Sequence, residues 1–287
     1  IRPFFSVIIN CFNSEEFLKE TIQSVLSQKN NDYEIIIWDN LSTDKTIDII
    51  ESFSDPRIKL YKSKNHTSLG FARNFAISKA NGHYLAFIDS DDLWSDDKLD
   101  KVKKVIEKYK KPIIISSNSY LIDSNSKITG LLHKSKPSVK GNGLMIRYNL
   151  SMETLVVPNK IINDNNIKFG DYSIIEEFDF ILTLSRYCQV HYIDLPLSSW
   201  RIHDKQLSTK KELDYPKELF QWIKKNKNNY SKVVLTYFKL LVTLKYILVS
   251  RKFNSDVEEK YIKSIILRKI VNNIPFTALE ILRKILK

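Results

Sequence analysis

The sequence predicts an α/β fold in which helices flank a mostly parallel sheet and a helical region follows the sheet. Short apolar runs rich in β-branched residues alternate with segments of helical periodicity as far as residue 89. Polar residues stand where these runs end, and the composition turns basic and helical near the C-terminus. With 287 residues, of which 43% are hydrophobic, the chain can bury a sizeable core.

The first strands and helices are predicted from the spacing of apolar residues. Phe4–Asn10 is an apolar run of the kind found in strands buried on both faces. Ser14 is a plausible N-cap for the next helix, in which apolar residues recur with helical spacing from Phe17 to Leu26. Tyr33–Trp38 predicts a second strand, and Thr43–Phe53 predicts a second helix.

The alternation then continues with a strand at Arg57–Tyr61, a helix at Gly70–Ala80 and a strand at His83–Ile88. Strands connected through helices run parallel, and such sheets bind ligands beyond the carboxyl ends of their strands. Polar side chains occupy those ends, namely Asn10, Asp39, Asn40 and Asp89. We therefore expect a binding site at this edge of the sheet.

Fewer elements are predicted in the rest of the chain. Helices are expected at Lys98–Lys111, at 175–187 and from about Asp214 onward, and strands at Pro112–Ser117 and Val190–Asp194. Residues 123–143 form a less regular section. Because the charge balance shifts near 205–215, we expect one domain over residues 1–208 and a basic helical region over 209–287.

The net charge of +12 is concentrated at the C-terminal end. Residues 204–287 contain 19 Lys and Arg against 8 Asp and Glu, whereas residues 1–203 contain 26 against 25. Such a basic region can meet nucleic acid, an anionic membrane surface or an acidic substrate, and solvated charge without a partner is the alternative. No zinc-finger, RRM or KH pattern is present, so a nucleic-acid partner is not expected.

The cysteines and the apolar runs indicate a compartment. Cys11 and Cys188 lack the spacing of a zinc site or a disulfide framework, which suggests a reducing environment. No uninterrupted apolar run approaches the ~20 residues that span a bilayer, and no signal-peptide pattern opens the chain. We expect a cytoplasmic protein, with the basic region 209–287 as a possible contact to the inner face of the cell membrane.

Three carboxylates follow the strand that ends at Ile88. Asp89, Asp91 and Asp92 would repel one another, and a hard divalent cation such as Mn²⁺ or Mg²⁺ relieves that repulsion through its oxygen ligands. A solvated acidic turn that caps the next helix is the alternative. The position at a strand end favours the metal site.

Four segments in this order resemble motifs of the inverting family 2 glycosyltransferases, whose fold is called GT-A. They are Ser6–Leu18, Asp39–Thr46 (DNLSTDKT), Ala72–Asn74 (ARN) and Ile88–Asp92 (IDSDD). The resemblance implies a GT-A fold and a metal-dependent transfer of sugar from a nucleotide diphosphate, most often in bacterial surface polysaccharide synthesis. It also assigns Asp89, Asp91 and Asp92 to the metal.

The resemblance further implies a set of nucleotide-binding residues: Cys11, Phe12, Asn13, Glu15, Asp39, Asn40, Arg73, Asp89 and Ser90. Within this set, Phe12, Asn13, Asp39 and Asn40 would hold the base and ribose, and Arg73 would reach the base or the diphosphate. Asn40 replaces the more common second Asp, so the expected UDP-sugar is one of several possible donors. A simple turn-forming role for Asn40 is the alternative.

Two later segments complete the resemblance. Glu176–Asp179 is similar to the motif that contains the general base, which implies Glu177 as the base and Asp179 as the rival on the same helix. Trp200–His203, with Gln206 and Ser208, is similar to the closing motif, which implies that Arg201 and His203 meet the diphosphate or the metal shell. The implied reaction is a single displacement that inverts the anomeric centre of the donor sugar.

Other classes of protein fit less well. A nucleotidyltransferase that makes nucleotide sugars would normally show a Gly-rich phosphate loop after its first strand, and residues 11–14 contain no glycine. A non-catalytic protein that binds nucleic acid or membranes would explain only the basic region. A catalytically dead scaffold would not need the acidic residues at 89–92 and 176–179. We therefore expect a glycosyltransferase that uses a nucleotide-sugar donor and a glycan or lipid-linked glycan acceptor.

Overall fold

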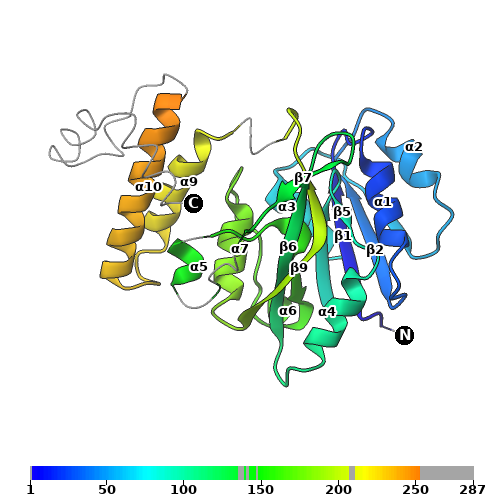
Figure 1. Cartoon of the computed structure of the whole chain (residues 1–287), viewed down its shortest axis with the longest axis horizontal. Helices are drawn as coiled ribbons and strands as arrows, with labels where there is room; N and C mark the ends of the chain where they lie inside the picture. The colour runs from blue at the N-terminus through cyan, green and yellow to red at the C-terminus, as the bar shows by residue number, and fades with distance from the viewer. Residues whose placement is uncertain (1, 135–138, 140–141, 147, 207–210, 253–287) are drawn as a thin grey trace. The chain divides into compact units, whose positions relative to one another are not determined.

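The computed structural model describes residues 2–134, 139, 142–146, 148–206 and 211–252 (Figure 1). The chain divides into two compact units, one made of residues 1–140 and 149–204 and the other of residues 141–148 and 205–287. The boundary near 205–215 stays a prediction, and nothing in the sequence separates residues 141–148 from their neighbours.

A nine-stranded sheet forms the centre of the first unit, with the order β3-β2-β1-β4-β8-β6-β9-β5 and β7 beside β6. The strands are β1 (Phe5–Cys11), β2 (Tyr33–Asp39), β3 (Ile58–Lys62), β4 (Tyr84–Asp89), β5 (Leu93–Trp94), β6 (Ile113–Ile122), β7 (Ile128–Leu131), β8 (Val156–Pro158) and β9 (Gln189–Arg201). β1 to β4 pair in parallel, as do β6 and β9. The shorter strands β5, β7 and β8 pair antiparallel. The predicted α/β class with a mostly parallel sheet is confirmed.

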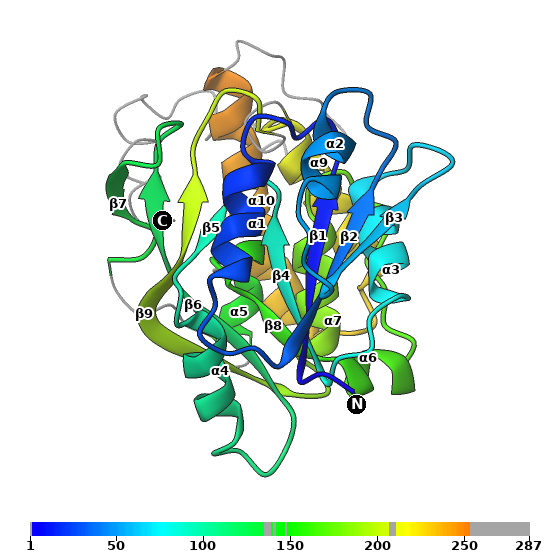
Figure 2. The ribbon, with the colours of Figure 1, turned by 90° about the vertical axis from the view of Figure 1, so that its right-hand side faces the viewer.

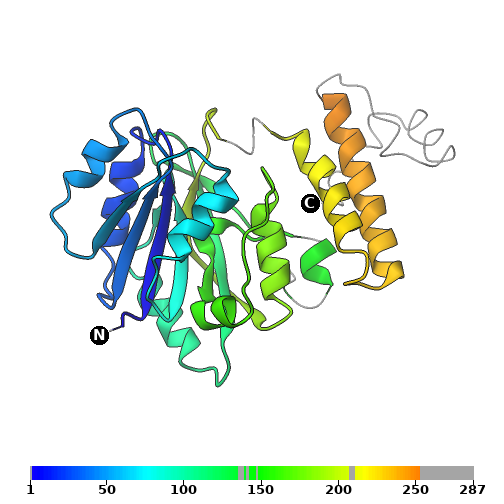
Figure 3. The same ribbon diagram turned by 180° about the vertical axis from the view of Figure 1, so that it is seen from behind.

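Helices cover both faces of this sheet (Figures 1 and 3). They are α1 (Leu18–Leu26), α2 (Thr46–Glu51), α3 (Leu69–Ile77), α4 (Lys98–Ile106), α6 (Asn159–Asp164) and α7 (Glu176–Leu184), with a 3₁₀ turn, η1, at Met152–Thr154. Because successive strand residues point to opposite faces, β1 and β2 can be apolar throughout and still pack on two helical layers.

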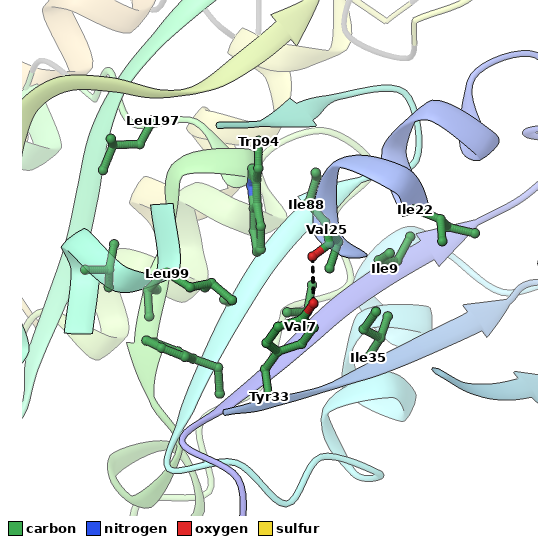
Figure 4. Packing of buried hydrophobic residues seen from close by; sticks show 14 of the residues in the cluster. Val7, Ile9, Ile22, Val25, Tyr33, Ile35, Ile88, Trp94, Leu99 and Leu197 are labelled. Atoms are coloured by element: carbon green, nitrogen blue, oxygen red, sulfur yellow. Dashed lines mark hydrogen bonds between the residues drawn. The ribbon is translucent and has the colours of Figure 1, made fainter. Parts of the chain in front are cut away.

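One face of the sheet packs against α1 and α4 in a continuous apolar core (Figure 4). Val7, Ile9 and Ile35 meet Ile22 and Val25 of α1 there, and all five side chains are buried. Tyr33 lies in the same core and donates its hydroxyl to the backbone oxygen of Val25 at 2.8 Å. Its polar atom is therefore satisfied inside the apolar layer.

The opposite face packs against α3 and α7 through aromatic rings. Phe169 and Phe180 stack with ring centroids 4.0 Å apart, and Phe87 of β4 meets both rings edge-on. Ala72 and Ala76 are buried on α3, where small side chains allow a close approach to the sheet. The end of β4, α3 and the start of α7 are thereby brought together.

Three local expectations need correction. α1 begins at Leu18 rather than next to Ser14, whose hydroxyl oxygen instead accepts from the backbone N–H of Phe12 at 3.2 Å. β9 continues to Arg201, well beyond the predicted Asp194, because β6 pairs with it along its length despite irregular register. β5 and β8 were missed, since strands of two and three residues show no readable alternation.

The second unit is helical where it is described, with α5 (Gly143–Ile146), α9 (Asp214–Lys225) and α10 (Lys232–Lys252). Trp222 is fully buried there, and its ring lies 5.5 Å from that of Tyr230 and 6.0 Å from that of Phe238. The helical prediction from Asp214 is thus correct as far as residue 252. The rest of the predicted basic helical region, residues 253–287, lies outside the described residues.

The sequence shows no uninterrupted apolar run long enough to span a bilayer, but α10 meets a less strict criterion. Lys232–Ser250 of α10 is long and apolar enough to cross a bilayer by length and composition, and 44% of it is buried inside the structure. Core helices of soluble proteins meet the same two criteria. The helix contains two charged residues, Lys239 and Lys245. It still meets the length and composition criteria for a membrane-spanning helix.

Candidate active site

The candidate site lies at the carboxyl ends of β1, β2 and β4, which stand side by side (Figure 2). The parallel register pairs Cys11 with Asp39 and Asn10 with Asp89. The residues that end three predicted strands are therefore neighbours in space, as expected for a parallel sheet that binds a ligand at this edge.

The loops after β1 and β2 are tied together by side-chain hydrogen bonds. Asn13 has a left-handed backbone (φ 51°), and its amide oxygen accepts from the N–H of Thr43 at 2.8 Å. A carboxylate oxygen of Glu15 accepts from the N–H of Lys45 at 3.0 Å. Ser14 and Ser90 share a hydrogen bond at 2.9 Å, which links the β1 loop to the Asp-rich turn. The side chains of Asn13 and Glu15 thus connect the β1 loop to the β2 loop.

Cys11 and Phe12 lie next to each other but face different environments. The thiol of Cys11 is buried in the apolar core and donates to the backbone oxygen of Trp38 at 3.6 Å, and this burial raises its pKa well above the usual value. The Cys11 side chain therefore does not fit the predicted nucleotide contact. Phe12 is exposed, and its ring meets that of His66 with centroids 4.3 Å apart.

Asp39 and Asn40 end β2 with different hydrogen-bonding patterns. Oδ2 of Asp39 accepts from the N–H groups of Leu41 and Ser42 at 3.2 and 3.1 Å, while its buried Oδ1 has no partner within the described residues. Both ends of the Asn40 amide contact Thr67. Nδ2 donates to the Thr67 backbone oxygen, and Oδ1 accepts from the Thr67 N–H and hydroxyl. The turn-forming alternative for Asn40 fits this arrangement.

The three acidic side chains of the Asp-rich turn have different environments. The turn itself closes through the N–H of Asp92, which donates to the backbone oxygen of Asp89 at 3.2 Å. The side chains of Asp89 and Asp91 are 39% and 28% exposed, whereas Asp92 is 1% exposed. Two carboxylates are thus available to a ligand, and the third points into the protein.

Asp92 is held inside by the chain end of β9. Its Oδ1 accepts from the backbone N–H of Arg201 at 2.9 Å. Burial, with the charges of Asp91 and Glu153, raises the pKa of Asp92 well above its usual value. This position favours a structural role for Asp92 over the predicted metal contact.

Arg201 is fully buried, and its guanidinium is occupied by the protein. It donates to the backbone oxygens of Asp91 (2.7 Å), Asp123 (3.3 Å) and Ser124 (3.3 Å), to the Ser126 hydroxyl (2.9 Å) and to a carboxylate oxygen of Glu20 (3.0 Å). Its Cζ also lies 4.4 Å from the centroid of the Phe17 ring. The predicted diphosphate contact of Arg201 does not fit this position.

His203 stands directly behind the second carboxylate of the turn. Its Nε2 lies 2.9 Å from Oδ2 of Asp91, and its ring packs against Phe17 with centroids 5.0 Å apart. Its Nδ1 is buried and has no hydrogen-bond partner in the described part of the chain. His203 orients Asp91, which suits a residue that supports the metal shell.

Arg73 joins the turn to α7. One end of its guanidinium donates to Oδ1 of Asp89 at 2.8 Å, and the other donates to Oε1 of Glu176 at 2.6 Å. Burial alone would lower the pKa of Arg73, but the charges of Asp89, Glu176 and Glu177 raise it. Arg73 therefore remains charged among carboxylates and is occupied by protein groups.

Glu177 and Asp179 follow Glu176 in the first turn of α7 and are both partly buried. Oδ2 of Asp179 lies so close to Gly170 that a β-carbon there would meet it at 2.7 Å. The family resemblance includes Glu176 in the Glu176–Asp179 motif but implies no role for it. The spacing of apolar residues in this segment does not predict that Glu176 contacts Arg73.

The residues present fit a divalent cation of the Mn²⁺ or Mg²⁺ type. Such ions are usually held by one or two carboxylates together with substrate phosphates, and Asp89 and Asp91 are the two accessible carboxylates of the turn. Within the described residues, no group of three or more Cys, His, Asp or Glu side chains is arranged to hold a metal. The protein alone thus offers an incomplete set of ligands that donor phosphates can complete.

Comparison with known proteins agrees with this geometry. Residues 6–157 match the family described as Glycosyl transferase family 2. The chain is 32% identical over 210 residues to the Escherichia coli UDP-Glc:alpha-D-GlcNAc-diphosphoundecaprenol beta-1,3-glucosyltransferase WfaP, which covers 72% of this chain and 80% of that enzyme.

Solved structures show the same fold. TarS residues 1–349 from Staphylococcus aureus, in complex with UDP, align with a TM-score of 0.60 at 20% identity, covering 90% of this chain and 68% of that one. The mannosyltransferase PcManGT from Pyrobaculum calidifontis, in complex with GDP-Man and Mn²⁺, aligns with a TM-score of 0.62 at 15% identity, covering 90% and 77%. With the sheet, the Asp-rich turn and the family match together, the chain belongs to glycosyl transferase family 2 and is a glycosyltransferase of the GT-A fold.

Proposed function

We propose that this protein transfers a sugar from UDP to a hydroxyl group of a lipid-linked glycan, with inversion and with a divalent cation. The observation that supports this most strongly is the pair of accessible carboxylates, Asp89 and Asp91, at the end of β4, together with Asp39 at the end of β2, on the other side of β1. Nucleobase, diphosphate and cation would then lie along one edge of the sheet.

Asp39 supports a uracil base. Its buried Oδ1 is an acceptor without a partner in the described structure, and a buried acceptor of this kind is costly unless a ligand donates to it. Uracil has a ring N–H in the position where cytosine has an acceptor, so UDP satisfies Asp39 and CDP does not. The Asn40 side chain already forms hydrogen bonds with Thr67, so Asp39 is the residue that would distinguish uracil from cytosine.

Asp89 and Asp91 would hold Mn²⁺ or Mg²⁺ together with the donor diphosphate. When bound, the cation would offset the negative charge of the diphosphate leaving group. The protein contributes the orientation of the two carboxylates, since Arg73 fixes Asp89 and His203 fixes Asp91. Of the two residues in the closing motif, His203 rather than Arg201 is therefore the one whose side chain contacts a proposed metal-binding carboxylate.

Glu177 is the proposed general base. It takes the proton of the acceptor hydroxyl, whose oxygen bonds to the anomeric carbon as the bond to the diphosphate oxygen breaks. The attack from the face opposite the leaving group inverts the anomeric centre. Asp179, on the same helix, is the rival base, and its Oδ2 lies so close to Gly170 that a β-carbon there would meet it at 2.7 Å.

The acceptor is proposed from the chemistry of the relatives. The similar Escherichia coli enzyme is named for a GlcNAc-diphosphoundecaprenol acceptor and a UDP-glucose donor. A water-insoluble acceptor of that kind places the reaction at a membrane surface. The basic region 209–287 would favour an anionic membrane surface, where each nearby Lys or Arg contributes about 1 kcal/mol.

A transfer assay tests the proposal. We would incubate the protein with Mn²⁺, a GlcNAc-diphospholipid acceptor and UDP-glucose, UDP-GlcNAc or GDP-mannose, and identify the product by mass and by the anomeric coupling constant in NMR spectra. We expect transfer from a UDP-sugar with an inverted anomeric centre, and loss of transfer in Glu177→Gln with UDP affinity retained. Transfer only from GDP-mannose, or retained anomeric configuration, would refute the proposal.

A further inference from the structure

Arg73 occupies the contact between three elements of the first unit. It comes from α3, donates to Asp89 at the end of β4 and donates to Glu176 in the first turn of α7. The side chains of Arg73 and Glu176 are only 4% and 6% exposed. A buried ion pair of this kind is strongly disturbed when one partner is removed, because the other charge is then left uncompensated.

The charges around Arg73 explain why an arginine stands there. Asp89 and Glu176 bind different nitrogens of the same guanidinium, and Glu177 contributes to the electrostatic field on it. A planar guanidinium can serve two carboxylates in fixed directions, whereas a lysine ammonium presents a single point of charge. The residue thus separates acidic groups that would otherwise repel one another.

The surrounding contacts hold α3 tightly against the segment before α7. Asn74 donates to the backbone oxygen of Phe169 at 3.0 Å and accepts from its N–H at 2.9 Å. A β-carbon on Gly70 would come within 2.6 Å of the backbone oxygen of Gly170. Cζ of Arg73 lies 5.5 Å from the centroid of the Phe169 ring. These contacts leave the Arg73 guanidinium little room to turn toward another ligand.

From these observations we propose that Arg73 is a positioning residue: it fixes the metal-binding carboxylate of Asp89 and the start of α7 relative to each other. The proposal rests on the proposed function, because it assigns Asp89 to the cation and α7 to the acceptor side. The expectation that Arg73 reaches the base or the diphosphate stays a prediction. The donor-side metal ligand and the general base at Glu177 are then set by one shared contact.

The two possible roles of Arg73 predict different behaviour of Glu176. If Arg73 acted only through a donor contact that does not depend on Glu176, Arg73→Lys would weaken UDP binding and Glu176→Gln would leave it unchanged. If Arg73 is a positioning residue, Glu176→Gln reproduces the effect of Arg73→Lys, because either change breaks the same link. The double variant then loses no more than the worse single variant.

The experiment is a double-mutant cycle on Arg73→Lys and Glu176→Gln with two readouts. UDP affinity is measured by calorimetry over a Mn²⁺ series, and unfolding by urea is measured with chelator present. Glu34→Gln is the matched control, because Glu34 is also a buried glutamate with a cationic partner, Lys59 at 2.6 Å, at the opposite ends of the strands. Arg57→Lys is the control for the arginine, since Arg57 pairs with Asp55 away from the site.

We expect each single variant to raise the Mn²⁺ concentration needed for UDP binding by about tenfold, as is common for groups that orient metal ligands. We expect the double variant to match the worse single variant in both readouts, and the two controls to keep the wild-type Mn²⁺ requirement. Additive effects, or an effect of Arg73→Lys alone, would overturn the positioning role.

The two readouts separate this inference from the proposed function. If the wild type binds no UDP at any Mn²⁺ concentration, the proposed function fails. In that case the unfolding measurements in chelator still decide whether Arg73 and Glu176 act as one unit, because that readout needs no ligand. Additive losses of stability in the cycle would refute the link even where UDP binding is normal.

Discussion

Two buried arginines stand on either side of the Asp-rich turn, and their surroundings differ. The region around Arg73 offers carboxylates from β4 and α7, whereas the region around Arg201 offers mainly backbone oxygens of the turn and of residues 123–124. Arg73 therefore balances charge at the site, and Arg201 holds chain segments in place. The family resemblance implied that Arg73 reaches the base or the diphosphate and that Arg201 meets the diphosphate or the metal shell.

The largest effect should come from removing the structural arginine. Arg201→Met leaves the backbone oxygens and Glu20 without their buried donor, so we expect the free energy of unfolding to fall by about 3–5 kcal/mol. Urea unfolding in chelator measures it. Arg57→Met, at a partly exposed pair with Asp55, should cost about 1 kcal/mol or less. Equal losses in the two variants would show that burial of Arg201 has no special weight.

The close contact around Arg73 can be broken without changing any charge. Gly70→Ala places a β-carbon 2.6 Å from the Gly170 backbone oxygen and must push α3 away from that segment, at a cost of about 1–3 kcal/mol. Gly130→Ala is the control, since its β-carbon would meet its nearest neighbour, Leu121, at an ordinary 3.8 Å. We expect thermal unfolding to separate the two variants. Unchanged stability of Gly70→Ala would mean that the α3 contact is loose.

The strand end at Asn40 tests a contact that does not involve an arginine. Asn40→Asp restores the more common acid of the family but removes the donor to the Thr67 backbone oxygen and places a carboxylate against it. We expect a loss of stability of about 1–2 kcal/mol and no gain in UDP affinity. Urea unfolding and calorimetry measure the two. Tighter UDP binding at unchanged stability would show that position 40 contacts the base.

Lys98 is a third buried basic residue, and its contribution to stability should depend on pH. Burial lowers the pKa of Lys98 from 10.5 to about 7, and its ammonium is near the Thr154 backbone oxygen and the Ser198 hydroxyl. Between pH 7 and 10.5 the unfolded chain binds more protons at this residue than the folded one. The free energy of unfolding should therefore rise with pH across this window, by at most about 1.4 kcal/mol per pH unit from this group.

Comparing wild type with Lys98→Met isolates that contribution, because the other lysines and the tyrosines titrate in both proteins. We expect the difference between the two proteins to grow in favour of the wild type as pH increases from 7 to 10. A difference that stays constant with pH would mean that Lys98 keeps its proton on folding.

The sequence predicted β1, β2 and β4 closely, because each of these strands is a continuous apolar run. The half of the sheet from β5 to β9 was predicted poorly. β5 and β8 are held by their partners and not by their own pattern, and β9 extends through Pro196 with an irregular register. Such elements depend on tertiary pairing that spacing does not encode.

In the site, the sequence predicted where residues lie better than which way their side chains point. The sequence predicted that Asp39, Asp89 and Asp91 lie at one edge of the sheet, because the carboxyl ends of parallel strands meet there. It did not indicate that Asp92 and Cys11 turn inward, because the direction of a side chain after a strand is fixed by distant partners such as the Arg201 backbone. The roles assigned to Glu177, Asp179 and His203 stay predictions.

The most direct test of the central claim is the Mn²⁺ dependence of UDP binding to the wild type and to Asp91→Asn, measured by calorimetry. We expect UDP to bind the wild type well with Mn²⁺ and weakly with chelator, because Asp89, Asp91 and the diphosphate share the cation. We expect Asp91→Asn to bind weakly under both conditions, with unfolding similar to that of the wild type. Equal UDP affinity with and without Mn²⁺ in both proteins would contradict the proposed metal-dependent donor site.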